Sequence, residues 1–394
     1  MKLAYVVAAL VFCASAILMW RAPIDGDIVE LSGYGHAVLN GQVPYRDFAL
    51  EYPPGSIPLF TLPALGEFVT WFRVENVIAW LLVLGLVAAL LEELYPRRRH
   101  NALLLGFVAI VPLLVGSFSL MRFDGWPTAC VLAALLLLLK RHPDWAMAAL
   151  ALGTLVKAWP LGLVPLFLVA GVRLRGLALY AAIVAAGLLP FAVLSPGGSY
   201  NGMMTQVDRH LEYESIGAVV LFVAHAHVHT YFEAGSRSVS GSLADHLASL
   251  QSLLQIAVFL LAAWLYARSG RRPQDFVRAL ALAVAGAAVL GKVLSPQYLL
   301  WLAPFVALVD SSLAVVLFGC ACLANRFLMP HMPNGLSDQR PEAVALLAVR
   351  NGFLLATTVV LGWRAAQRTR IGGESSSRSP SFRLMRGPAT RPTR

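Results

Sequence analysis

Long apolar stretches recur along the chain and are separated by shorter polar links. Two examples are NVIAWLLVLGLVAALL (76–91) and LLQIAVFLLAAWLYA (253–267). A helix needs about 20 apolar residues to cross the roughly 30 Å hydrocarbon core of a bilayer. Such stretches predict about twelve membrane-spanning helices, at residues 3–22, 72–95, 101–118, 126–139, 144–157, 158–172, 176–194, 248–267, 275–293, 297–309, 312–328 and 343–363. The predicted fold class is an all-α polytopic membrane protein.

The composition agrees with this fold class. Apolar residues make up 58% of the 394 residues and charged residues 13%, against roughly 25% charged residues in soluble domains. The net charge is +10, but much of the excess lies in a Ser/Arg/Pro/Gly-rich C-terminal stretch, so nucleic acid is excluded as a partner. The sequence predicts a transmembrane domain at 1–363 and a basic, disordered tail at 364–394. The four cysteines lie in apolar runs and form no disulfide or zinc pattern.

The positions of Lys and Arg predict the orientation, because these residues gather in cytoplasmic loops. If Lys2 is cytoplasmic, strict alternation of the spans places RRRH, KRH, RLR, RSGRR and the basic tail on the cytoplasmic side as well. Both termini are then cytoplasmic, and the two longest links, 23–71 and 195–247, face the exterior. An A-x-A pattern at 14–16 leaves a cleaved signal peptide as the alternative, but the apolar run continues to Trp20 and favours a span.

The first outer loop begins with three acids, Asp25, Asp27 and Glu30. The residues from Asp27 to Gly41 predict a short amphipathic helix at the membrane surface, and Pro53-Pro54 predicts extended chain before it. Asp27 and Glu30 have the spacing of a capping box. Spacing alone leaves three interpretations open: a helix cap, a catalytic carboxylate, or a metal bound by Asp25 and Asp27.

Further polar residues stand at predicted outer ends of spans. Lys292 precedes Pro296, which is expected to break a helix there and to free backbone groups, and Lys157 precedes a similar break. Each lysine is either a snorkelling anchor or a ligand of a phosphate. Arg122 and Asp124 either pair across a turn or line a site.

The second outer loop contains Arg209, His210 and Glu212, which are candidates for contacts to an acceptor or a phosphate. Its HAHVH stretch (225–229) has a spacing that permits zinc, but no acid or cysteine nearby completes a site. We therefore predict no metal. The chain contains no GxGxxG, P-loop, HExxH or GxSxG element, so nucleotide-binding, protease and hydrolase functions have no support.

Several outer-face motifs together resemble those of a known family. Asp27 precedes GQVPY (41–45) by fourteen positions, and EYPPG (51–55), RFDGWP (122–127), VKAWPLGLVP (156–165) and KVLSPQYLLWLAP (292–304) follow. This set resembles the bacterial polyprenol-phosphate-mannose-dependent α-mannosyltransferases of the GT-C type. The SPQYLLW run is the most specific part of the match. The chain departs from the family at 31 and 32, where Leu and Ser stand in place of a frequent aromatic residue.

The resemblance implies a GT-C-like bundle of about twelve transmembrane helices, with amphipathic interfacial helices in the outer loops. It implies transfer of mannose, with inversion, from a polyprenyl-phosphate-linked donor to a hydroxyl of a glycolipid or glycan, at the outer face of a bacterial plasma membrane and without a cofactor. Asp27 is then the general base, and Asp25 is held in reserve. The candidate residues for binding the donor phosphate and the substrates are Tyr45, Glu51, Tyr52, Arg122, Asp124, Lys157, Arg209, His210, Lys292, Gln297 and Tyr298. The alternatives are a transporter or flippase of a lipid-linked sugar and a GT-C transferase of arabinose or glucose.

Overall fold

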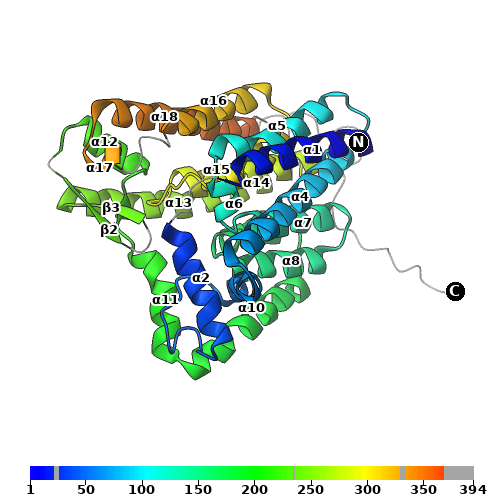
Figure 1. Ribbon diagram of the computed structural model, residues 1–394. Coiled ribbons are helices and arrows are strands. Elements are labelled where there is room, and N and C mark those ends of the chain that lie inside the picture. Colours follow the sequence, from blue (N-terminus) through cyan, green and yellow to red (C-terminus); the bar gives the residue numbers. More distant parts are fainter. Residues whose placement is uncertain (22–25, 227, 234–235, 329–333, 368–394) are drawn as a thin grey trace.

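The computed structural model describes residues 1–21, 26–226, 228–233, 236–328 and 334–367 (Figure 1). Most of these residues are helical, and the prediction of an all-α polytopic membrane protein is confirmed. The predictions for Asp25 and for nearly all of the C-terminal tail concern residues outside the described part of the chain.

Every predicted span coincides with a helix. The corresponding helices are α1 (Lys2–Met19), α4 (Phe68–Leu94), α5 (His100–Val115), α7 (Gly125–Leu139), α8 (Pro143–Val156), η3 with α9 (Trp159–Leu163 and Val164–Val169), α10 (Leu174–Leu194), α13 (Ser242–Ala267), α14 (Pro273–Val289), α15 (Tyr298–Leu308), α16 (Ser312–Leu328) and α18 (Pro341–Ala366). Among the described residues, five of these helices are long and apolar enough to cross a membrane: α1, α4, α10, α13 and α18. The others are shorter, so a total of twelve spans stays a prediction.

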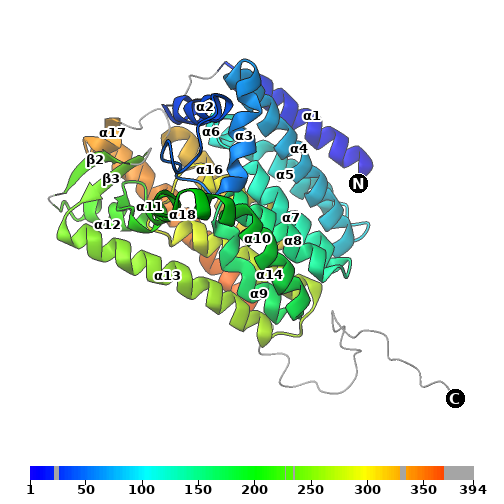
Figure 2. The ribbon, with the colours of Figure 1, turned by 90° about the horizontal axis from the view of Figure 1, so that it is seen from below.

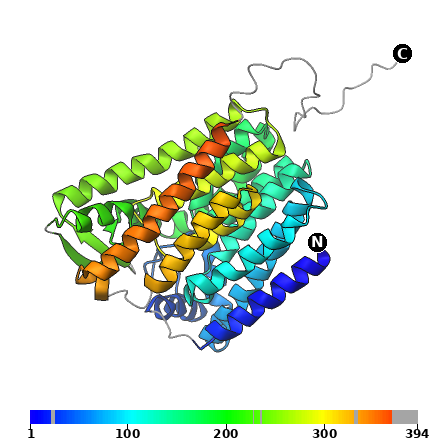
Figure 3. The same cartoon turned by 90° about the horizontal axis from the view of Figure 1, so that it is seen from above.

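The helices form one bundle, and apolar side chains lie both in its core and on its outer surface. Seen from above, α13, α18, α16, α5 and α1 succeed one another across one face (Figure 3). Nearly all residues of α14 are buried, whereas α10 buries only Gly176 and Tyr180. A helix that is apolar all round belongs either in a core or against lipid, and these two helices represent the two cases.

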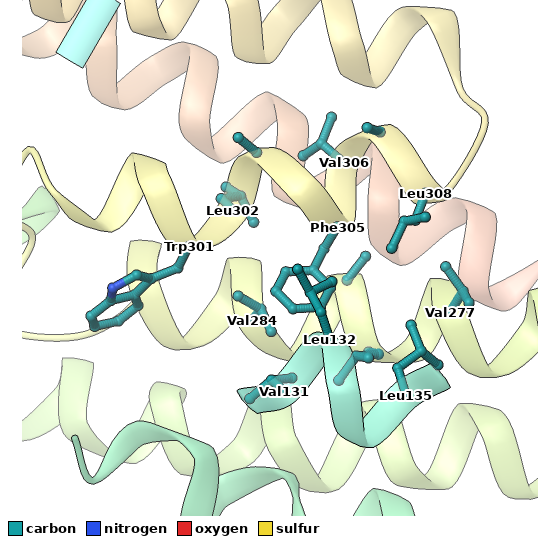
Figure 4. Close-up of a cluster of buried hydrophobic side chains, with 14 of the residues drawn as sticks. Val131, Leu132, Leu135, Val277, Val284, Trp301, Leu302, Phe305, Val306 and Leu308 are labelled. Carbon is teal, nitrogen blue, oxygen red and sulfur yellow. The ribbon is translucent and has the colours of Figure 1, made fainter. Parts of the chain in front are cut away.

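The centre of the bundle is a cluster of large apolar side chains from α7, α14 and α15 (Figure 4). Phe305 of α15 points toward Leu132 of α7, and Trp301 lies at one end of the cluster. Phe305 and Leu132 are fully buried. The cluster thereby holds the first turn of α15, which carries Tyr298 and Trp301, in a fixed position.

The predicted helix break near Pro296 is present between α14 and α15. Backbone groups freed by such a break inside a membrane protein need new partners. Two glutamines of α13 supply them: Gln251 Nε2 donates to the carbonyl of Gly291 at 2.8 Å, and Gln255 Nε2 donates to that of Ala287 at 2.6 Å. The break is therefore stabilised by side chains that the sequence analysis did not consider.

The elements outside the bundle gather at one end of it. They are α2 (Gly26–Leu39), η1 (Pro54–Ser56), α3 (Ile57–Thr61), η2 (Pro63–Leu65), α6 (Phe118–Met121), α11 (Pro196–Asp208), α12 (Ile216–Val223), α17 (Asn334–Ser337), and the strands β1 (Leu211–Glu212), β2 (His229–Glu233) and β3 (Ser236–Ser240). The N-terminus and the last turn of α18 lie at the opposite end (Figures 1 and 3). The two long links that were predicted to share a side thus do lie together.

The second long link differs from the prediction, because it contains a small sheet besides helices α11 and α12. The strands are antiparallel in the order β1-β3-β2. They are short and largely polar, so they lack the alternating apolar pattern by which a strand is recognised. The sheet was therefore not predictable from periodicity.

In the first long link, α2 packs closely against α3. A Cβ on Gly35 would lie 2.1 Å from the carbonyl oxygen of Phe60, so glycine is what permits this approach. Helix α2 ends at Leu39, and Gly41 follows with φ +80°, where the prediction placed the end. The extended segment stops at Pro53, since Pro54 already begins η1.

Candidate active site

A cavity of about 1070 Å³ opens where the two long links meet the helix ends. Its walls come from α2, the 51–53 segment, the α8–η3 junction, the sheet, α13 and the α14–α15 break. The charged residues that line it are Asp27, Glu30, Glu51, Glu212, Glu214, Arg122, Lys157, Arg209, Arg237 and Lys292. Acids and cations are thus brought together from segments far apart in the sequence.

Asp27 lies in the first turn of α2, and its Oδ2 is 2.6 Å from Nη2 of Arg122. Arg122 belongs to the link between α6 and α7 and is 6% exposed. The predicted capping box is wrong, because α2 begins at Gly26 and Asp27 is therefore inside the helix. Glu30 instead accepts a hydrogen bond from the hydroxyl of Tyr34 at 2.5 Å.

The predicted alternative that Arg122 and Asp124 pair with each other is also wrong. Asp124 is fully buried, and its Oδ1 accepts from Lys157 Nζ at 2.7 Å and from Trp301 Nε1 at 2.5 Å. Arg122 and Asp124 stand two residues apart, just before α7, and they pair with different residues: Arg122 with Asp27, and Asp124 with Lys157. Asp124 supports the cavity wall from behind and does not line it.

Lys157 is enclosed by aromatic rings as well as by Asp124. Its Nζ lies 5.2 Å from the ring centroid of Phe123, 5.3 Å from that of Trp301 and 5.8 Å from that of Tyr298. Trp301 also stacks on Tyr298, with centroids 3.9 Å apart. Cation–π attraction and one carboxylate therefore hold the ammonium group at the cavity wall.

Acids crowd the side of the cavity near α2. Burial raises the pKa of Glu51, and the nearby charges of Glu30 and Asp27 raise it further, whereas Arg209 opposes the rise. Tyr52, next in the chain, is packed edge-on against Phe123 with centroids 5.0 Å apart. Cations from the second long link thus offset part of this negative charge.

The sheet is joined to the α14–α15 break by backbone pairing. The amide of Glu212 donates to the carbonyl of Lys292 at 2.9 Å, and the amide of Leu294 donates to Glu212 Oε2 at 2.7 Å. Lys292 Nζ donates to the carbonyl of Val207 at 2.5 Å, and Arg209 Nη2 donates to Ser236 Oγ at 3.1 Å. These bonds position Arg209 and Lys292 on one wall.

A second buried ion pair supports the same wall. Arg350 of α18 is fully buried and lies 2.5 Å from Glu214 Oε2. Arg350 Nη2 and Asn351 Nδ2 donate to the carbonyl of Glu214 at 3.1 and 2.9 Å. Burial raises the pKa of Glu214, and Arg350 opposes this rise. The pair was missed because an Arg within an apolar helix carries no signal that identifies its partner.

One part of the cavity wall is apolar. It is formed by Leu161, Gly162 and Pro165 on one side and Ile256, Phe259 and Leu260 of α13 on the other. Ile256 and Leu260 are more than half exposed. This part of the wall, called the apolar groove below, thus belongs to the same cavity as the charged residues and includes side chains of α13 that are largely exposed.

The structure brings most predicted site residues together but not all of them. Asp27, Glu51, Tyr52, Arg122, Lys157, Arg209, Lys292, Gln297 and Tyr298 line the cavity. Tyr45 does not: its hydroxyl donates to the carbonyl of Tyr52 at 2.5 Å, and its own carbonyl accepts from Ser195 Oγ. His210 is exposed beside the ring of Tyr231. Arg237 and Gln255 line the cavity without having been predicted, since neither belongs to a motif.

Within the described ranges, no group of three or more His, Cys, Asp or Glu side chains is placed to hold a metal ion. The chemistry that the residues offer is a carboxylate beside a cationic wall. A carboxylate can accept a proton from a hydroxyl, and the cations and hydrogen-bond donors can bind a phosphate.

Comparison with protein families decides the class of this site. The family model for glycosyltransferase family 87 matches residues 50–296. The chain belongs to glycosyltransferase family 87. It is therefore a membrane glycosyltransferase, and its cavity is the candidate active site. Among curated proteins, none matches the chain significantly. The matched region includes Arg122, Lys157, Arg209 and Lys292 but begins after Asp27.

Proposed function

We propose that this glycosyltransferase transfers mannose from a polyprenyl-phosphate-linked donor to a hydroxyl of a cell-envelope glycolipid or glycan. The reaction takes place at the outer face of a bacterial plasma membrane, and both termini are cytoplasmic. The observation that carries the proposal is the cavity itself, in which Asp27, a cationic wall and an apolar groove meet. The positive-inside pattern of the sequence supports the orientation.

Each part of the cavity has a role in this reaction. The apolar groove beside α13 accepts the isoprenoid tail, and Lys157, Arg209 and Lys292 bind the phosphate. Nucleotide sugars are cytosolic, so a transferase with an outward-facing site requires a lipid carrier for its sugar. Glu51 and Tyr52, on the opposite wall, contact the acceptor.

The transfer is a single displacement. Asp27 accepts the proton of the acceptor hydroxyl while that oxygen attacks the anomeric carbon. The bond from the anomeric carbon to the phosphate oxygen breaks, its electron pair leaves with the lipid phosphate, and the configuration inverts. The cations stabilise the charge that grows on the leaving phosphate. Asp25, outside the described residues, is the reserve for the role of Asp27.

The test is transfer from labelled polyprenyl-phosphate-mannose by the purified protein in lipid nanodiscs, with mixed envelope lipids and glycans as acceptors. Asp27→Asn is expected to lower the rate about 10²–10⁴-fold. Asp144→Asn is the matched control, because Asp144 pairs with Arg175 at 3.5 Å outside the cavity, and it should transfer as the wild type does.

Equal transfer by Asp27→Asn and the wild type would remove Asp27 from the mechanism. Polyprenyl-phosphate donors of arabinose and glucose, assayed alongside, decide the sugar: faster transfer of either would replace mannose in the proposal. Movement of the lipid-linked sugar across the bilayer without any transfer would instead support a flippase.

A further inference from the structure

The ion pair between Asp27 and Arg122 is asymmetric in how its two members are held. Arg122 is 6% exposed, its guanidinium lies 5.2 Å from the ring centroid of Phe118, and its Nη1 donates to the carbonyl of Met121 at 3.3 Å. Both contacts come from α6, which in turn packs on α4 and α5 of the bundle. The place of the guanidinium is therefore set without Asp27.

Asp27 is held differently, because α2 is not part of the bundle. Helix α2 packs on α3 and η2, and its Ile28 and Leu31 are buried in one apolar cluster with Phe60 of α3. The side chain of Asp27 is 22% exposed and faces the cavity. The ion pair thus ties the first turn of a peripheral helix to a fixed point in the bundle.

Among the described residues, the groups that interact with Asp27 include acids and a phenol, and Arg209 of the second long link acts on the same Glu51, Tyr52 and Glu212. Glu30 lies on the same helix. Glu51 and Tyr52 interact with Asp27 electrostatically from the segment after α2, and Glu212 does so from β1. Like charges favour the protonated form of a carboxyl, whereas an adjacent guanidinium favours the ionised form. A base must be ionised before it can accept a proton.

We propose that Arg122 is the positioning residue of the catalytic base: it orients the Asp27 carboxylate toward the acceptor and keeps it ionised among neighbouring acids. This inference rests on the proposed function. It differs from the interpretations of the sequence, in which Arg122 either paired with Asp124 or was a candidate for binding the donor phosphate or a substrate. The guanidinium acts through Asp27, and the phosphate is bound by the cations of the other walls.

The experiment measures transfer as a function of pH for the wild type, Arg122→Gln and Arg122→Lys. The acid limb of kcat/KM reports the ionisation of the base in the free enzyme. Arg122→Gln removes the charge that favours ionised Asp27, so its acid limb should move upward by about 1–3 pH units. Its rate at neutral pH should fall about 10–100-fold and recover in part at higher pH. Arg122→Lys, which keeps the charge, should return the limb toward the wild-type position.

Two results would overturn the inference. The first is a uniformly lower rate for Arg122→Gln with the acid limb unmoved, which is what a purely structural arginine predicts. The second is a raised KM for the donor with kcat and the limb unchanged, which is what a phosphate ligand predicts. If Arg122→Gln does not fold, a wild-type limb in Arg122→Lys supports the inference, and a limb displaced upward contradicts it.

Arg175→Gln is the matched control, since Arg175 is 89% exposed and pairs with Asp144 away from the cavity. It should keep the wild-type profile. Asp27→Asn in the same series separates the two proposals. Full activity in Asp27→Asn refutes the proposed base and with it this inference, whereas an inactive Asp27→Asn with no limb shift in Arg122→Gln refutes the inference alone.

Discussion

The pair of Asp124 and Lys157 permits a quantitative test of how the cavity wall is held. The side chain of Asp124 is 0% exposed and that of Lys157 is 17% exposed, with 2.7 Å between Nζ and Oδ1. At an effective dielectric constant of about 20, two unit charges at this distance attract by about 6 kcal/mol. Desolvation offsets most of this attraction, so the pair as a whole contributes little, but removing one partner costs about 3–5 kcal/mol.

Lys157→Met should be the more damaging of the two single variants. It leaves a fully buried carboxylate with the indole N–H of Trp301 as its remaining donor among the described contacts. In Asp124→Asn, the lysine retains three aromatic neighbours and can extend into the cavity. The double variant Lys157→Met/Asp124→Asn has no unpaired charge and should recover most of the lost stability.

The free energy of unfolding can be measured by SDS titration in mixed micelles, with tryptophan fluorescence as the signal. Lys140→Met is the control, because Lys140 pairs with Glu93 on the surface and its side chain is 53% exposed. This control should cost less than about 1 kcal/mol. The reasoning fails if Lys157→Met costs no more than Lys140→Met, or if the losses of the two single variants simply add. Transfer by the double variant should stay low, since the proposed phosphate ligand is absent.

Two further predictions concern the buried pair of Arg350 and Glu214 and the apolar groove beside α13. Arg350→Met leaves the buried Glu214 without the charge that opposes the rise of its pKa, which is about 8 in the wild type; because the folded-state pKa then lies above 8, the variant should lose further stability relative to the wild type as the pH rises above about 8. Unfolding at several pH values measures this, and a loss independent of pH would contradict it. A Cβ on Gly162 would lie 2.4 Å from the ring of Phe259, so Gly162→Ala should push the ring into the apolar groove and raise the KM for the lipid donor about 10-fold with kcat little changed. Gly352→Ala, where the added Cβ meets nothing within 4 Å, should behave as the wild type.

The sequence predicted those features that depend on local residues alone. The helical segments, the helix end before Gly41 and the break near Pro296 follow from local hydrophobicity and backbone chemistry. Motif resemblance also placed Lys157, Lys292 and Tyr298 at one site, and all three line the cavity. Reasoning from spacing failed for the Asp27–Glu30 capping box, since the helix begins one residue earlier than the acid.

The cavity walls were harder to predict because they depend on contacts between distant segments. Arg237 reaches the cavity through the pairing of β3 with its neighbours, and short polar strands have no period that reveals such pairing. Glu214 and Arg350 are widely separated in sequence and give no local indication of each other. Tyr45, although part of a matched motif, packs against the start of α11.

By itself, the sequence determined which segments are apolar helices and where polar residues interrupt them. The reason is that an apolar segment in lipid must satisfy its backbone hydrogen bonds internally, and this requirement applies to each segment separately. Only the tertiary structure decided how the charges are paired. Arg122 and Asp124 stand two residues apart, yet Arg122 pairs with Asp27 on a peripheral helix and Asp124 pairs with Lys157 at the C-terminal end of α8. An ion pair depends on where two backbones lie relative to each other, and that arrangement follows from packing of the whole bundle.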